Sequence, residues 1–197
     1  MPFDLFDQPP LPPGDHVFPV GLQPCATPVH CQARRASGAF QQGVGAAWQA
    51  LNAEGALATC VLSGEDSATL VMGGFGFSLP AGATVLGVTV AVRRSMLYGD
   101  DCQLVDAHLS LWDVAAGGAV GVGDPKPSSH WWPRRPLWAV YGGPFSRWGL
   151  PDGTGGLTRD LVNATTFAAA LRAREQAGSS GTAVVGDCVA AAWYRLL

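Results

Sequence analysis

The sequence predicts an all-β fold: an antiparallel, jelly-roll-like β-sandwich over residues 41–197, preceded by an extended proline-rich arm over residues 1–40. From about residue 40 onwards, short segments alternate apolar and polar residues, with turn residues between them, which is typical of β-sandwiches. Eight Phe, three Tyr and seven Trp supply enough apolar surface for one core. Eight of the fifteen prolines fall within residues 1–30 and predict the arm.

The prediction of an extended arm follows from the chemistry of proline, which fixes φ and has no backbone N–H to donate. A segment this rich in proline forms neither a helix nor an interior strand, so polyproline-like segments are expected. A solvated linker would not need the large apolar residues that this segment also contains. We therefore expect the arm to lie along its own domain or a neighbouring subunit, with Phe3, Phe6 and Phe18 as contact residues.

The two clearest predicted strands are residues 85–94 and 103–112. In the first, the three valines at 88, 90 and 92 share a face, because successive strand residues point to opposite sides. In the second, the apolar residues at 105, 107, 109 and 111 share a face, and Asp106, His108 and Ser110 lie on the other. Residues 98–101 predict a hairpin connection between the two strands.

Weaker patterns predict five further strands: residues 56–62, 67–72, 75–79, 137–141 and 182–196. Thr158 can act as the N-cap of a short helix that begins after it. Residues 167–176 are rich in alanine, which favours a helix, but they also alternate as a strand does. We expect a strand there, because the neighbouring segments are strands.

Composition excludes several classes of function. The net charge of −3 argues against a nucleic-acid-binding protein, which needs a clustered positive surface. No apolar run approaches the ~18 residues of a membrane-spanning helix, so no membrane partner is expected. Acidic residues near the start replace the bases of a signal peptide, which predicts a soluble, non-secreted protein.

The titratable residues form no recognisable catalytic pattern, so we expect no enzymatic activity and no cofactor. The five cysteines (Cys25, Cys31, Cys60, Cys102, Cys188) favour buried free thiols over a metal site. Residues 63–66 read as a polar turn. Asp100, Asp101 and Asp106 favour a solvated hairpin tip over a cation site, because the spacing of a calcium loop is missing.

A group of tryptophans marks the remaining candidate site. Trp131, Trp132, Trp138 and Trp148 crowd a proline-rich span that also holds Arg134, Arg135 and Arg147. Exposed aromatic residues beside arginine are common at protein interfaces, and flat indole rings can also stack on sugars. The alternative is that these rings complete the core at one end of the sandwich.

The order of several motifs resembles a β-sandwich module that recurs in virion proteins of tailed phages and prophages. Residues 74–83 read Gly-Phe-Gly-Phe-Ser-Leu-Pro-Ala-Gly-Ala and lead into the valine-rich strand. Trp-Gln-Ala-Leu-Asn-Ala (48–53) comes before this segment, and Tyr-Gly-Gly (141–143), Trp-Gly (148–149) and Leu-Val-Asn-Ala (161–164) follow it. The match covers roughly residues 45–197, and its individual motifs are degenerate. The arm and the Trp-Trp-Pro insert (131–133) depart from the pattern, so the resemblance implies nothing about either.

The resemblance implies a structural protein of the virion, assembled in the host cytoplasm and present in many copies. Its expected partners are other virion proteins (portal, adaptor, tail or capsid proteins) and further copies of itself. We expect attachment at the head–tail junction or the tail, as a fibre or appendage protein. Capsid decoration is the first alternative. Binding of a host glycan or receptor by the tryptophan span is the second.

Overall fold

The computed structural model describes residues 11–18, 28–52, 58–97, 102–115, 118–122, 130–151, 156–176, 178 and 180–196. Twelve strands and one short helix form in these ranges. They are β1 (Gly14–Phe18), β2 (Val29–Arg35), β3 (Gly38–Gln42), β4 (Trp48–Gln49), β5 (Ala58–Ser63), β6 (Thr69–Gly73), β7 (Ala83–Leu97), β8 (Leu104–Ala115), β9 (Gly118–Val122), β10 (Leu137–Gly142), α1 (Arg159–Asn163), β11 (Phe167–Glu175) and β12 (Ser180–Leu196).

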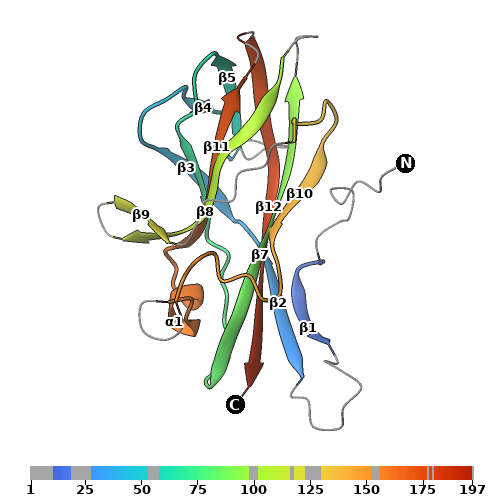
Figure 1. Cartoon of the computed structure of the whole chain (residues 1–197). Coiled ribbons are helices and arrows are strands. Elements are labelled where there is room, and N and C mark those ends of the chain that lie inside the picture. The colour runs from blue at the N-terminus through green and yellow to red at the C-terminus, as the bar shows by residue number, and fades with distance from the viewer. Residues whose placement is uncertain are drawn as a thin grey trace.

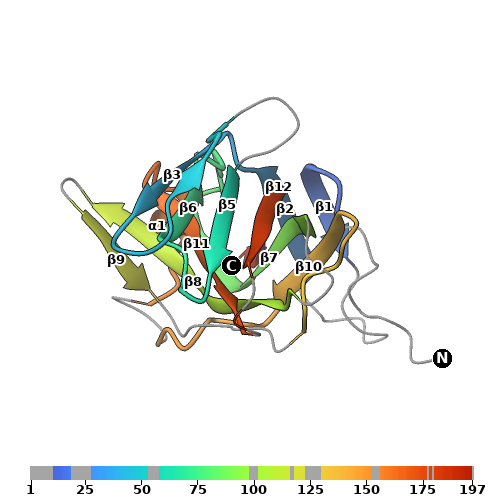
Figure 2. The same ribbon diagram turned by 90° about the horizontal axis from the view of Figure 1, so that it is seen from above.

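Two antiparallel sheets face each other, which confirms the predicted β-sandwich (Figures 1 and 2). Sheet A contains β1, β2, β12, β5 and β4, with β7 on the other side of β12 and β10 beyond β7. Sheet B runs in the order β3-β6-β11-β8-β9. Strand pairs are nested along the chain: β8 pairs with β9, β7 with β10, and β2 with β12. Together with the pairing of β6 with β11, this nesting characterises a jelly roll, here with β3, β4 and β5 inserted between β2 and β6.

The core lies between the two sheets and follows the alternation of the strands. Val88, Val90 and Val92 of β7 are fully buried in it, as predicted. The alanine-rich segment is strand β11, paired with β6 and β8, so the strand interpretation is confirmed. Thr158 caps the short helix α1 by accepting a hydrogen bond from the Leu161 backbone N–H.

The predicted strand at residues 75–79 is wrong, although its alternation is right. Phe75, Phe77 and Leu79 are buried, and the residues between them are exposed. Gly74 and Gly76 have φ values of 68° and 65°, which strand residues do not adopt, so this segment pairs with no strand. Amide side chains satisfy its backbone instead. The Gln32 Oε1 accepts from the Ser78 N–H, and the Asn163 side chain bonds both the N–H and the C=O of Leu79.

The predicted hairpin between the two clearest strands is also wrong. Residues 98–101 lie outside the described residues, but β7 belongs to sheet A and β8 to sheet B, so the connection crosses between sheets. The faces of β8 differ from the prediction as well. Opposite β11, Arg172 pairs with His108 and Ala173 with Asp106, which leaves Ala107 as an extra residue in a bulge. The bulge reverses the alternation, so Asp106 faces the core.

The described part of the N-terminal arm is built into the sandwich. β1 pairs with β2 along the edge of sheet A, and β2 lies between β1 and β12. Residues 29–40, predicted to be part of the arm, therefore belong to strands β2 and β3 of the two sheets or connect them. The sandwich begins earlier than predicted because the last proline of the arm is Pro28. From Val29 onwards Val29, Cys31 and Ala33 alternate with other residues, as in a strand.

Candidate interaction surfaces

The tryptophan span divides into exposed and buried rings. Trp131 is 59% exposed, and Arg134 and Arg135, a few residues later in the sequence, are exposed too. Trp132 and Trp148 are each 1% exposed and belong to the core, where the Trp148 indole N–H donates to the Val88 carbonyl. For these two rings the core-completing alternative holds, so Trp132 is not available to a partner.

Trp132 contributes to a buried polar cluster that joins the two sheets. Its indole N–H donates to Asp106 Oδ1 at 2.8 Å, and the Tyr141 hydroxyl donates to Asp106 Oδ2. Arg94 Nη2 lies 3.2 Å from the same Oδ2, and its guanidinium carbon lies 5.1 Å from the centre of the Trp132 ring. Arg94 and Tyr141 come from sheet A, and Asp106 comes from sheet B. The cluster therefore ties the sheets together through one carboxylate.

Burial sets the electrostatics of this cluster. Removal from water raises the pKa of Asp106, and the Arg94 charge and the two donated hydrogen bonds oppose that rise. Burial and the neighbouring carboxylate raise the pKa of Tyr141 well above its ordinary value. Tyr141 therefore keeps its proton and acts as a hydrogen-bond donor.

A second, smaller apolar cluster lies on the outer face of sheet A. Cys31 and Ala33 of β2 and Val189 and Ala191 of β12 are buried there, although they point away from the core between the sheets. The side chains packed over them are Leu11, Trp138 and Trp193. Leu11 precedes β1, so this part of the arm lies along its own domain. Trp138 is half-buried on this face.

The remaining predicted contact residues lie at the limits of the structure. Phe3 and Phe6 are outside the described residues. Phe18 is the last residue of β1, and its side chain is likewise outside them.

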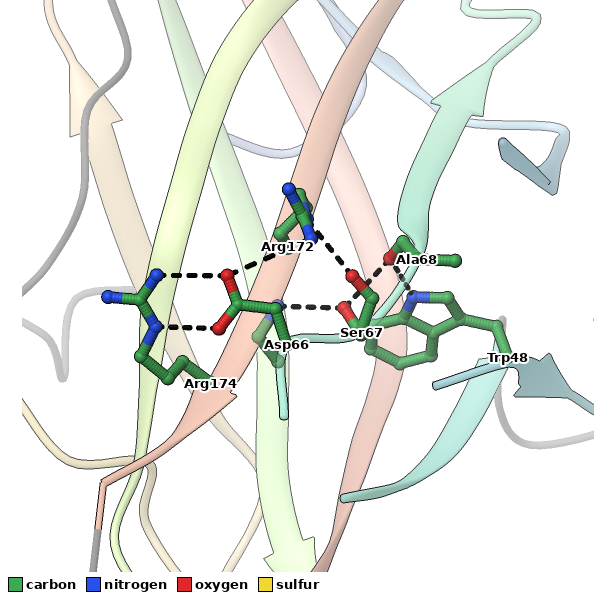
Figure 3. A network of polar contacts seen from close by, with 7 residues as sticks. Trp48, Asp66, Ser67, Ala68, Arg172 and Arg174 are labelled. Atoms are coloured by element: carbon green, nitrogen blue, oxygen red, sulfur yellow. Dashed lines mark hydrogen bonds and ion pairs between the residues drawn. The ribbon is translucent and has the colours of Figure 1, made fainter. Parts of the chain in front are cut away.

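The predicted polar turn at residues 63–66 leads into an ion-pair cluster on sheet B (Figure 3). The Arg174 Nε and Nη2 donate to the two Asp66 oxygens at 2.6 and 2.9 Å, and Arg172 Nη2 lies 3.7 Å from Asp66 Oδ2. The Arg172 Nε also donates to the Ser67 carbonyl, and the Ser67 hydroxyl accepts from the Ala173 N–H. These bonds fix both guanidiniums on β11. Hydrogen bonding from Arg174 lowers the pKa of Asp66.

The thiols are structural in the part of the chain that the structure describes. Cys31, Cys60 and Cys188 are free and buried, Cys102 is buried too, and Cys25 lies outside the described residues. Burial raises the pKa of Cys31 to about 12 and that of Cys60 to about 11. The described residues hold no group of three or more His, Cys, Asp or Glu that could bind a metal ion. Their one helix, α1, has five residues, too few to cross a membrane.

Sequence reasoning missed Arg94, Asp106 and Asp66 as structural centres. Asp106 carries no signal in the sequence, because its inward orientation depends on the bulge at Ala107. The core-facing orientation of Arg94 could have been predicted from the sequence, because Arg94 lies on the same face of the strand as Val88, Val90 and Val92.

Comparison with known proteins adds little to this picture. No protein-family profile and no curated protein sequence matches the chain. Among solved structures, the VP1 pentamer of Human Polyomavirus 6 aligns over 91% of this chain and 96% of that chain, with 11% identity and a TM-score of 0.20. That score is too low to carry any conclusion about fold or function, and the assignment of a β-sandwich stands on the strand pairing alone.

Proposed function

We propose that the chain is a structural component of a tailed-bacteriophage virion, present in many copies and attached at the head–tail junction or the tail through protein–protein contacts. Residues along the free surfaces of the sandwich make those contacts. The protein joins the particle as a fibre or appendage subunit in the host cytoplasm. It acts as a scaffold, without a catalytic step.

The packing of the segment at residues 74–83, whose sequence resembles phage sandwich modules, supports this proposal most directly. Phe75 and Phe77 of that motif pack against Phe167, with ring centres 5.9 to 6.2 Å apart. Asn163, from the later Leu-Val-Asn-Ala motif, holds the backbone of Leu79. Motifs that lie far apart in the sequence thus form one structural unit in the core. These motifs therefore stabilise the sandwich, as expected in a structural protein.

Mass spectrometry of purified virions from cells that carry the encoding genome tests this function. The expected result is that the chain is present in many copies per particle. Immunogold labelling then locates it, with gold expected at the neck or tail. Gold spread over the head would support capsid decoration instead. Absence of the chain from purified particles contradicts the proposal.

One observation favours a second function, recognition of a host glycan. Trp131 presents a large exposed ring that is suited to stacking on a sugar, and Arg134 and Arg135, which follow it in the sequence, are exposed too. Binding on a glycan array that disappears in Trp131→Ala, with an unchanged melting temperature, would support it. Trp132→Ala does not serve as a test, because that ring is part of the core.

A further inference from the structure

A cavity of about 360 Å³ opens on the outer face of sheet B, where β3 and β11 begin and β6 and β8 end. This volume is near the lower end of the range for small-molecule sites, about 300–1,000 Å³, so one small ligand fits it. The walls of the cavity are open to solvent. Phe40 is 41% exposed, and three polar residues of the lining are exposed too: Ser37, Asn52 and Thr165. The described side chains therefore leave this space accessible.

Two glycines that pair across neighbouring strands create the hollow. Gly38 of β3 lies opposite Gly73 of β6, and both face outward, because the adjacent residues Ala39 and Met72 point into the core. Neither glycine has a φ in the left-handed region, so the backbone does not require glycine at either position. A Cβ on either one would make ordinary contacts, the closest at 3.4 Å. Glycine weakens a strand, and it often marks a place where a ligand approaches the backbone closely.

Uncharged hydrogen-bonding groups line the hollow. The Asn52 Nδ2 donates to the Ala39 carbonyl at 3.0 Å, and the Asn52 Oδ1 accepts from the Ala39 N–H at 2.7 Å. A side-chain amide has two N–H groups and two lone pairs, so one of each remains for a ligand. Ser37 and Thr165 add exposed hydroxyls, which both donate and accept. The described part of the lining thus offers donors and acceptors but no charged side chain.

The exposed ring of Phe40 gives the cavity an aromatic side. The face of an aromatic ring carries partial negative charge and attracts the partly positive hydrogens of C–H groups. A pyranose ring has C–H groups on its faces and hydroxyls around its rim, so it matches an aromatic ring next to amide and hydroxyl groups. An anion does not match, because the Thr166 hydroxyl in the lining donates to the Asp113 carboxylate, which would repel it.

This cavity and the exposed ring of Trp131 lie at opposite ends of β8. The backbone N–H of Trp132 donates to the carbonyl of Leu104, the first residue of β8. Val114, near the last residue of the same strand, lines the cavity. At about 3.3 Å per residue, the strand between Leu104 and Val114 is roughly 30 Å long. A ligand in the cavity therefore does not reach Trp131, and the two are separate sites.

We propose that the cavity on sheet B binds one neutral pyranose unit, an uncharged hexose or N-acetylhexosamine of a glycan. The sugar ring stacks on Phe40, and its hydroxyls bond the Asn52 amide and the Thr165 hydroxyl. The hollow left by Gly38 and Gly73 lets the ring approach the strands closely. This inference goes beyond the structural role proposed above, and it holds whether or not the chain is part of a virion.

NMR titration of the isotope-labelled full chain tests the site. The probes are the methyl glycosides of glucose, galactose, mannose and N-acetylglucosamine, each added separately, with N-acetylneuraminic acid as a charged comparison. At least one neutral glycoside should bind with a roughly millimolar dissociation constant, as a ligand of this size does. The backbone amide signals of Gly38, Gly73 and Thr165 should shift on binding, and that of Trp131 should not.

Two variants and two controls assign the binding to this cavity. Gly73→Val fills the hollow with a residue that strands favour, so binding should be lost while the melting temperature does not fall. Phe40→Ala should raise the dissociation constant about two- to tenfold, which corresponds to the contribution of one aromatic contact. Phe145→Ala is the matched control for Phe40→Ala, because Phe145 is 65% exposed and does not line the cavity. Phe145→Ala and Trp131→Ala should leave the constant unchanged.

Four outcomes would each overturn the proposal: no binding of any neutral glycoside, tighter binding of N-acetylneuraminic acid, binding that survives Phe40→Ala unchanged, or binding that is lost in Trp131→Ala. The last result would assign the sugar to the Trp131 ring instead. Phe40→Ala keeps the test decisive if Gly73→Val does not fold, because Phe40 is an exposed side chain on an edge strand. The virion role is measured separately on purified particles, so it stands if only the sugar site is refuted.

Discussion

Asp106 shows how much of the sandwich depends on one side chain. A carboxylate that is 2% exposed is costly to bury, and it is retained here because three donors converge on it, Arg94 and Tyr141 from sheet A and Trp132 from the loop before β10. The Arg94 Nε and Nη1 have no hydrogen-bond partner among the described residues, so Arg94 depends on Asp106 for its charge balance. Loss of the carboxylate would leave a buried cation without a counter-ion.

We therefore expect Asp106→Ala to destabilise the fold by roughly 3–5 kcal/mol, the usual cost of breaking a buried ion pair on one side. Tyr141→Phe removes one hydrogen bond to the carboxylate and keeps the ring, so about 1–2 kcal/mol is expected. Urea unfolding followed by tryptophan fluorescence measures both. A loss for Asp106→Ala no larger than that for Tyr141→Phe would contradict the assigned role of the ion pair.

Asp66 makes the stability of the fold depend on pH in the acidic range. Its pKa is below the ordinary 3.8 because Arg174 donates hydrogen bonds to the carboxylate, so the folded state favours the charged form. The stabilisation is present above the ordinary pKa and is lost as the pH falls through the lowered one. Asp66→Asn should therefore melt at a lower temperature than the parent chain at pH 7, and the difference should shrink below about pH 4. Calorimetry from pH 7 to pH 3 measures it, and a constant difference would contradict the prediction.

At the scale of elements, alternation identified most strands but not their partners. The valine row of β7 was predictable, because one buried face imposes a period of two on the sequence. The alternation of β11 alone left a helix open, and its prediction as a strand depended on the neighbouring strands. The inward turn of Asp106 was not, because the single extra residue at Ala107 reverses every side chain before it on β8. The same limit applies to the tryptophan span. Trp131 and Trp132 are neighbours in the sequence, but in the fold Trp132 is buried and Trp131 is exposed.

The segment at residues 75–79 is buried like a strand but is held by side-chain amides. The Asn163 amide makes two hydrogen bonds to Leu79, at 2.8 and 3.0 Å, across 84 positions of sequence. Asn163→Ala should destabilise the fold by about 2 kcal/mol, because both bonds are lost and Leu79 keeps two unsatisfied groups. Asp160→Ala, at an exposed position of the same helix, should stay within about 0.5 kcal/mol. Chemical unfolding of the pair measures the contrast, and equal effects would show that the amide does not hold the segment.

At the scale of the whole molecule, the first described strand closes the edge of sheet A. β1 pairs with β2 over five residues, and Leu11 covers the outer cluster. Deletion of residues 1–24 removes both and exposes Cys31 and Ala33, so we expect the melting temperature to fall by about 5–10 °C. Deletion of residues 1–10 keeps β1 and Leu11, and should leave the melting temperature unchanged. Calorimetry of the two truncated chains measures the difference, and equal melting temperatures would contradict the bracing role of residues 11–18.

The position of β12 has a consequence for how the protein is made. It lies between β7 on one side and both β5 and β2 on the other, so residues 180–196 supply the strand that joins the halves of sheet A. A ribosome must translate nearly all of the residues described here before that strand exists. Until then, β2, β5 and β7 carry unpaired backbone that can pair with another nascent chain. Sheet A therefore closes only at the end of synthesis, and the yield of native protein should depend on chaperones that shield those strands during translation.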